Sequence, residues 1–228
     1  MIRRDYILRM IEEFIQVLSR INALKKGLKW DEAERLLEKE FQEFAGTLGP
    51  NVTELSQTEL LARLVTGAPT QAVRERTLML ATLLREAGEV AEAQGKAEQG
   101  GRYYLKGLDI VLDVGGTEEP FEWPAFVPAV EMFVASLGER EIPLATRARL
   151  MRHYEFSGDF AKAEDTLFAM LEQDPLNTSI LDFGVAFYRR MLEHSDAALA
   201  NGNLPRTEIE AGLAELQAKQ ASAAKTTC

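Results

Sequence analysis

The feature that most constrains the fold is the segment from Gly158 to Pro175, GDFAKAEDTLFAMLEQDP. Between this glycine and this proline, apolar residues recur every three or four positions, which is the period of one face of an α-helix. These residues are Phe160, Ala163, Leu167 and Met170. Ala163 is small enough for a second helix to approach closely, Gly158 permits a tight turn before the helix, and Pro175 ends it. The segment therefore predicts the second helix of an antiparallel helix pair.

The same spacing resembles the second helix of the tetratricopeptide repeat, whose pattern is Gly-x-Tyr-x-x-Ala-x-x-x-Phe-x-x-Ala-x-x-x-x-Pro. Gly158, Ala163 and Pro175 match this pattern, and apolar residues of other types stand at three of its remaining positions. Such repeats stack into scaffolds that bind other macromolecules, and at least three of them are needed for a stable array. The resemblance therefore implies a binding protein whose other helices are diverged repeats or caps.

The first helix of this pair, which begins near residue 143, matches the repeat less closely. Leu150 and Tyr154 are the residue types that the family has at these positions. Arg147 replaces the usual tryptophan, and Met151 replaces the usual glycine. Because a small residue is lost at position 151, we expect the two helices of this unit to cross at an altered angle.

A fainter copy of the pattern lies near the N-terminus. Trp30, Ala33 and Leu37 have the same offsets as the three apolar residues that follow Gly158, but Glu40 stands where an alanine is expected. The whole chain also resembles a bacterial family of uncharacterised repeat-like proteins, through its opening RRDYILRMIEEF and its closing NGNLPRTEIEAGLAEL. That second resemblance implies no known activity.

The remaining sequence also predicts helices. Apolar periodicity, capping patterns such as Ser56 with Glu59, and Gly or Pro at the ends define the segments. We expect helices over residues 2–26, 31–45, 56–64, 69–88, 103–112, 132–137, 143–173 (as a pair), 177–200 and from about 207 onward, with a poor helix or an exposed loop over 88–101. No alternating strand of useful length is found. The fold class is therefore predicted to be all-α, with antiparallel helix pairs stacked as a short tetratricopeptide-like superhelix, although the same pattern fits a closed bundle.

The domain organisation follows from the breaks in this pattern. Residues 1–219 are expected to form a single helical repeat-like domain, and residues 220–228 a flexible tail. The clearest break is the connector over residues 115–128, which contains three prolines and two glycines. Because proline disfavours helix in the residue before it, this connector is the place where the domain could be subdivided.

Composition and charge narrow the class of partner. Of the 228 residues, 46% are apolar and 27% are charged, as in an ordinary globular protein, and the formal net charge is −10. An acidic surface opposes binding to nucleic acid and to anionic lipid, since both depend on Lys and Arg. Cys228 is the only cysteine, so no disulfide forms within the chain. Since neither a signal peptide nor a membrane span is recognised, we expect a cytoplasmic protein.

The resemblance also supplies candidate binding residues, because the first helix of each repeat lines the inner surface of such a superhelix. Its register directs Arg152, Glu155 and Phe156 to that surface. One repeat later it directs Asp182, Arg189 and Arg190 to the same surface. Arginine offers planar bidentate donors, so Arg152 with Arg189 could clamp a carboxylate or an acidic peptide. The alternative is that these residues are solvated and pair with glutamates nearby.

The N-terminal helix carries a second candidate surface. Its apolar stripe alternates by three and four positions, as in a helix that pairs with its copy in a homodimer. The stripe consists of Ile7, Met10, Phe14, Val17, Ile21 and Leu24. The alternative is that the stripe packs on residues 31–45 and the body of the same chain. Ile11 and Leu18 widen the stripe, and a pure dimer seam is narrower.

No motif predicts catalysis. His153 and His194 lie on different predicted helices without a cysteine or second histidine at ligand spacing, so no metal or cofactor is expected. The leading hypothesis is a non-enzymatic helical scaffold that binds a protein or peptide. One alternative is a structural homodimer, and the other is an enzyme or small-ligand binder with a pocket around Tyr104, Trp123 and Tyr154.

Overall fold

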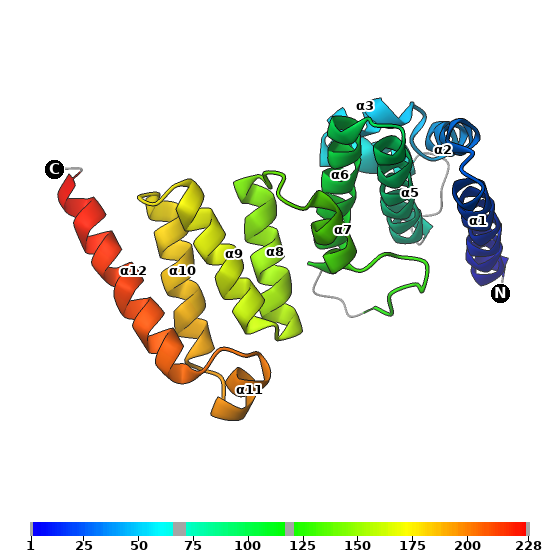
Figure 1. The fold of residues 1–228 in the computed structure, drawn as a ribbon. Coiled ribbons are helices and arrows are strands. Elements are labelled where there is room, and N and C mark those ends of the chain that lie inside the picture. The colour runs from blue at the N-terminus through cyan, green and yellow to red at the C-terminus, as the bar shows by residue number, and fades with distance from the viewer. Residues whose placement is uncertain (1, 66–71, 117–120, 227–228) are drawn as a thin grey trace. The chain divides into compact units, whose positions relative to one another are not determined.

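The computed structural model describes residues 2–65, 72–116 and 121–226 (Figure 1). Within these ranges the chain forms twelve α-helices and no strand, so the predicted all-α class is confirmed. The chain divides into two compact units, Met1–Glu141 and Ile142–Cys228. No helix in the described part of the chain combines the length and the apolar character needed to cross a membrane.

The first unit is built around one helical hairpin. Its helices are α1 (Ile2–Lys26), α2 (Trp30–Ala45), α3 (Gly49–Glu54), α4 (Gln57–Val65), α5 (Val73–Ala93), α6 (Ala97–Gly115) and α7 (Val130–Leu137). The antiparallel helices α5 and α6 make the most extensive contact, with α2 packed on α5 and α7 packed on α6. Most of α5 is buried, including Leu80, Leu83 and Leu84. The core of this unit therefore lies along α5.

Of the two alternatives expected over residues 88–101, a poor helix or an exposed loop, the loop is wrong, because α5 continues to Ala93 and α6 begins at Ala97. Gly88 and Gly100 mark close helix contacts instead of helix ends. A Cβ atom at Gly88 would lie 2.3 Å from Cε1 of Tyr104, and one at Gly100 would lie 2.7 Å from Cγ of Glu92. Both distances are too short for a side chain, so glycine lets α5 and α6 approach each other.

The described part of the predicted connector belongs to the first unit. Residues 117–120 lie outside the described residues, and residues 121–128 precede α7. The ring of Phe126 contacts that of Phe14 on α1 at a centroid distance of 5.2 Å. Trp123 packs on Phe121 at 4.8 Å, and Arg74 lies over the Phe121 ring. Aromatic contacts therefore fix this connector on the unit.

A cluster of charges joins α1 to α5. The ammonium of Lys25 donates to Glu86 at 2.5 Å and also to Glu89. Arg85 pairs with the same two carboxylates, at 2.5 Å to Glu89. The side chains of Lys25 and Glu86 are largely removed from water, at 14% and 9% exposure. These pairs hold the C-terminal end of α1 on α5.

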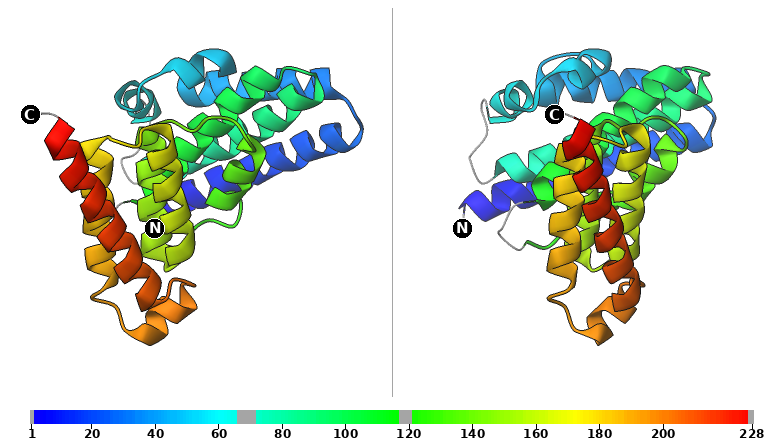
Figure 2. Two further views of the ribbon diagram at one scale, coloured as in Figure 1. Left: turned by 60° about the vertical axis from the view of Figure 1, so that its left-hand side comes forward. Right: turned by 90° about the vertical axis from the view of Figure 1, so that its left-hand side faces the viewer.

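The second unit contains two antiparallel helix pairs. Its helices are α8 (Leu144–Ser157), α9 (Phe160–Gln173), α10 (Thr178–Met191), α11 (Asp196–Asn201) and α12 (Arg206–Thr226). Helix α8 packs on α9 and α10 packs on α12. The four long helices run side by side, with α11 at the turn between α10 and α12 (Figures 1 and 2). The expected tail over 220–228 is helical as far as Thr226.

The segment from Gly158 to Pro175 forms the helix that its spacing predicts. Gly158 follows α8 with φ +82, the left-handed region that glycine adopts without strain. The four apolar residues of α9 are buried: Phe160, Ala163, Leu167 and Met170. The predicted single helix over 177–200 is wrong, because α10 ends at Met191 and Ser195 caps the separate helix α11 through the N–H of Ala198. The chain turns there, so α12 can return along α10.

Candidate functional site

The strongest candidate site lies on α8 and α10, which an ion pair joins. The guanidinium of Arg190 donates two hydrogen bonds to the carboxylate of Glu155, from Nε to Oε1 at 2.5 Å and from Nη2 to Oε2 at 2.8 Å. The pairing raises the pKa of Arg190, because the bonds to Glu155 favour the charged guanidinium. These two residues are 35 positions apart, and both belong to the predicted inner surface. The structure therefore brings two of the six candidate residues into direct contact.

Three further candidates lie on the same two helices as this ion pair. Arg152 lies one turn before Glu155 on α8, and Arg189 adjoins Arg190 on α10. Both arginines are exposed, and neither has a hydrogen bond or ion pair with another described residue. Phe156 is 93% exposed, more than any other large apolar residue of the described chain. An exposed aromatic ring and one cation therefore lie one turn apart on α8, and a second cation adjoins Arg190 in the sequence of α10, on the face that it shares with Asp182.

The sixth candidate, Asp182, is directed elsewhere. Its Oδ1 accepts a hydrogen bond of 2.6 Å from Nε2 of Gln220 on α12. This contact ties the N-terminal half of α10 to α12, so Asp182 is engaged within its own helix pair. Sequence reasoning missed the role of Gln220, because only the return of α12 along α10 brings residues 38 positions apart together.

The helices that carry the site are held by a packed framework. The side chain of Asn177 caps α10 by accepting from the backbone N–H groups of Ser179 and Ile180. Tyr154 on α8 is buried, whereas Arg152 and Phe156 of the same helix are exposed. At Gly184 a Cβ atom would lie 2.5 Å from Leu216 of α12, so α10 and α12 pack closely. The exposed residues of the site are therefore placed by helices that are themselves anchored.

The residues expected to mediate self-association lie on the inward side of α1. Phe14 and Ile21 are buried in the first unit, and Phe14 packs edge-on against Phe44 of α2 at 6.0 Å. The other four are half-buried: Ile7, Met10, Val17 and Leu24. The face of α1 that contains Phe14 and Ile21 is thus covered by the chain itself.

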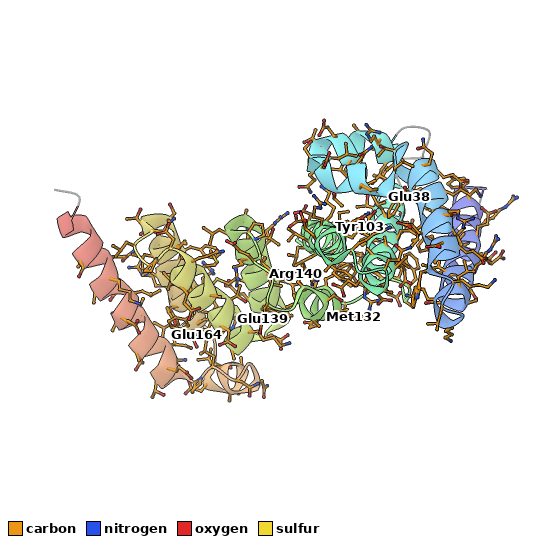
Figure 3. All side chains as sticks on the ribbon, turned by 45° about the horizontal axis from the view of Figure 1, so that its top comes forward. Glu38, Tyr103, Met132, Glu139, Arg140 and Glu164 are labelled. Atoms are coloured by element: carbon orange, nitrogen blue, oxygen red, sulfur yellow. The ribbon has the colours of Figure 1, made fainter. Side chains whose placement is uncertain are left out.

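The residues of the alternative small-ligand pocket are distributed over both units. Tyr104 is buried against Gly88 in the first unit, and burial raises the pKa of its hydroxyl to about 12. Trp123 is 41% exposed in the connector, and Tyr154 belongs to the second unit. A small cavity between α2, α5 and α6 is bordered by Glu38 and Tyr103 (Figure 3). It holds about 10 Å³, room for about one water molecule and far less than a ligand pocket occupies.

The two histidines lie beside different aromatic rings. His153 is half-buried on α8 beside the ring of Tyr154, and His194 follows α10 beside Phe160. Among the described residues, no group of three or more His, Cys, Asp or Glu side chains is placed to hold a metal ion.

Comparison with known proteins adds a family. No curated protein and no solved structure matches the chain. Residues 1–221 match a family described as a family of unknown function (DUF6483). Because the match extends over both units, the chain belongs to the family of unknown function DUF6483.

Proposed function

We propose that this protein is a binding module whose second unit recognises an acidic segment of another protein through the surface formed by α8 and α10. The single observation that carries the proposal is the exposure of Phe156 one turn from Arg152 on α8, an arginine that has no partner among the described residues. Covering an exposed aromatic ring with another surface removes apolar area from water and so favours binding. Aromatic residues and arginine are also enriched at the centres of protein interfaces.

Charge complementarity favours an acidic segment as the partner. Residues 142–228 contain nine Lys or Arg and twelve Asp or Glu, so the attraction of an acidic segment has to come from individual arginines and not from the charge of the whole unit. The carboxylate of Glu155 is already held by Arg190. Arg152 and Arg189 therefore remain to bind carboxylates of a partner, with the bidentate geometry that guanidinium offers.

The Glu155–Arg190 pair has a supporting role in this proposal. It joins α8 to α10, the two helices that carry Arg152 and Arg189, through one bidentate contact. An ordered surface loses less conformational entropy on binding than a mobile one. The pair therefore positions the surface, while Phe156 and the two arginines make the contacts.

A peptide array tests this proposal. The probes are immobilised peptides of about twelve residues with an aromatic or aliphatic residue next to two or three Asp or Glu, together with composition-matched peptides that carry Lys instead. The full chain is compared with Arg152→Glu/Arg189→Glu and with Phe156→Ala. The matched control is Arg20→Glu/Arg35→Glu, which changes the charge equally at exposed positions of the first unit.

We expect acidic peptides to be retained by the wild type and by the control, and to be lost by both site variants. Retention should weaken as salt is added, because the contacts are charge pairs at the surface. If the site variants retain the same peptides as the wild type, or if no acidic peptide exceeds its Lys-containing counterpart, the proposal is wrong.

A further inference from the structure

An apolar seam on the outer side of α1 is only partly covered by the described chain, since Ile11 and Leu18 are half-buried and Leu8 and Ile15 are exposed. The spacing between successive seam residues alternates between three and four positions. The seam consists of four apolar residues and one asparagine: Leu8, Ile11, Ile15, Leu18 and Asn22. Leu8 and Ile15 are each 50% exposed, whereas Phe14, the neighbour of Ile15, is 3% exposed. The rest of the first unit therefore covers only part of the apolar surface of α1, and the outer part of that surface is exposed to water.

The spacing of the side chains along this seam suits a facing helix. A shallow hollow, open to solvent and formed by α1 alone, is lined by Ile15, Leu18, Ser19 and Asn22, and it continues past them to Ala23 and Lys26. Residues at positions i, i+3, i+4 and i+7 form the four-sided hole that receives one side chain of a facing helix in a coiled coil. The first four residues of the hollow have this spacing.

We propose that a second copy of this chain occupies the seam, with the two α1 helices running parallel. In a parallel pair of identical helices each seam residue meets its own copy, so a charged residue would meet a like charge. The seam from Leu8 to Asn22 contains none, although Arg9, Glu12 and Glu13 lie on the same helix. Asn22 suits a self-pairing position, because its amide both donates and accepts, and a single asparagine in a seam specifies the register of a parallel dimer.

The position of the rest of the unit selects the parallel orientation. Phe14 and Ile21 border the seam on one side, and Phe14 packs on Phe44 and Phe126, so the body of the unit lies on that side. In an antiparallel pair of α1 helices, the remaining helices of the first unit of both copies would lie on the same side of the pair and would compete for space. In a parallel pair they lie on opposite sides. The other border of the seam is polar, with Glu12, Ser19 and Lys26.

The experiment compares two neighbouring substitutions on α1 by sedimentation velocity over a wide range of protein concentration. Ile15→Lys places a charge in the seam, whereas Gln16→Lys places the same charge on the exposed neighbouring position outside it. We expect wild type and Gln16→Lys to dimerise with the same concentration dependence, and Ile15→Lys to remain monomeric with unchanged helix content. Leu8→Lys serves as a second seam variant should Ile15→Lys fail to fold.

Cross-linking tests the orientation independently. In a Cys228→Ser background, Asn22→Cys should form a disulfide-linked dimer under mild oxidation, because a self-pairing position brings the two Cα atoms within disulfide range. The inference is overturned if the wild type stays monomeric, if Ile15→Lys or Leu8→Lys dimerises like the wild type, or if the dimer forms but Asn22→Cys does not cross-link. It does not rest on the peptide-binding proposal, which concerns the other unit.

Discussion

The hydroxyl of Tyr188 on α10 donates a hydrogen bond of 2.6 Å to the carboxylate of Glu164 on α9, inside the second unit. Glu164 is only 8% exposed, and it is labelled in Figure 3. Burial raises the pKa of this carboxyl, the bond from Tyr188 partly opposes that change, and the carboxylates of Glu208 and Asp165 add to it. The ionised form of Glu164 is therefore less stable in the folded unit than in water.

This relationship predicts a pH dependence of folding. A carboxyl with a raised pKa in the folded state contributes most stability below its unfolded pKa, about 4.3, and loses that contribution as the pH rises through the folded value. Every tenfold difference between its folded and unfolded ionisation constants lowers the stability at neutral pH by about 1.4 kcal/mol. Glu164→Gln removes the titration and retains an oxygen that accepts from Tyr188. We expect its thermal midpoint to exceed that of wild type at neutral pH and the difference to shrink on acidification towards the unfolded pKa.

The control for this prediction is Glu208→Gln. Glu208 is an exposed carboxylate that acts on Glu164 from α12, so its removal should change the pH profile much less. Thermal unfolding followed by circular dichroism, from mildly acidic to mildly alkaline pH, measures both variants. A Glu164→Gln profile parallel to that of wild type would contradict the prediction.

Local signals in the sequence were sufficient for much of this unit. The spacing of Phe160, Ala163 and Leu167 predicted the buried face of α9, and Gly158 predicted the turn before it, because both depend on residues close together in the chain. In the first unit, the capping box of Ser56 with Glu59 is also confirmed, by reciprocal bonds at 2.9 and 3.3 Å. Helix class and these helix ends are therefore readable from sequence.

Other features depend on partners that are distant in the chain. A glycine can mark the end of a helix, or it can allow a neighbouring helix to pack closely. Gly88 has the second role, and this follows only from the position of Tyr104 on the neighbouring helix. In the candidate site, the repeat register placed Glu155 and Arg190 on one surface, and they are in contact. The same register gave no indication that Asp182 would turn to Gln220, because it does not describe the return of α12.

The close contact at Gly88 predicts a loss of stability in Gly88→Ala. Alanine favours a helix over glycine by about 1 kcal/mol. Its Cβ atom, however, would lie 2.3 Å from the buried ring of Tyr104. Because overpacking of a tight core costs about 1–3 kcal/mol, we expect a net loss of stability. Urea unfolding of the full chain measures it.

A double-mutant cycle separates this contact from a general effect of alanine. In a Tyr104→Leu background the smaller side chain leaves room, so Gly88→Ala should cost less there, or even stabilise the chain. An equal loss of stability in both backgrounds would show that the Tyr104 ring is not the cause.

The charge cluster between α1 and α5 predicts that Lys25→Met destabilises the first unit. Lys25 contacts Glu86 and Glu89, and its removal leaves two carboxylates with Arg85 alone. Leaving a buried charge without its partner is costly, and we expect a loss of about 1–3 kcal/mol. Urea unfolding measures it, and Glu86→Gln added to Lys25→Met should recover part of the loss. A double variant less stable than Lys25→Met would contradict this account.

The ion pair at the candidate site predicts only a small effect on folding. The side chains of Arg190 and Glu155 are 44% and 16% exposed. Pairs this near the surface contribute about 1 kcal/mol or less. Arg190→Gln and Glu155→Gln, alone and together, should reveal a coupling of this size in urea unfolding, and it should diminish at high salt. Arg189→Gln is the matched control, since Arg189 has no partner among the described residues and its loss should leave stability unchanged. A cost for Arg189→Gln equal to that for Arg190→Gln would show that the pair with Glu155 does not hold α8 and α10 together.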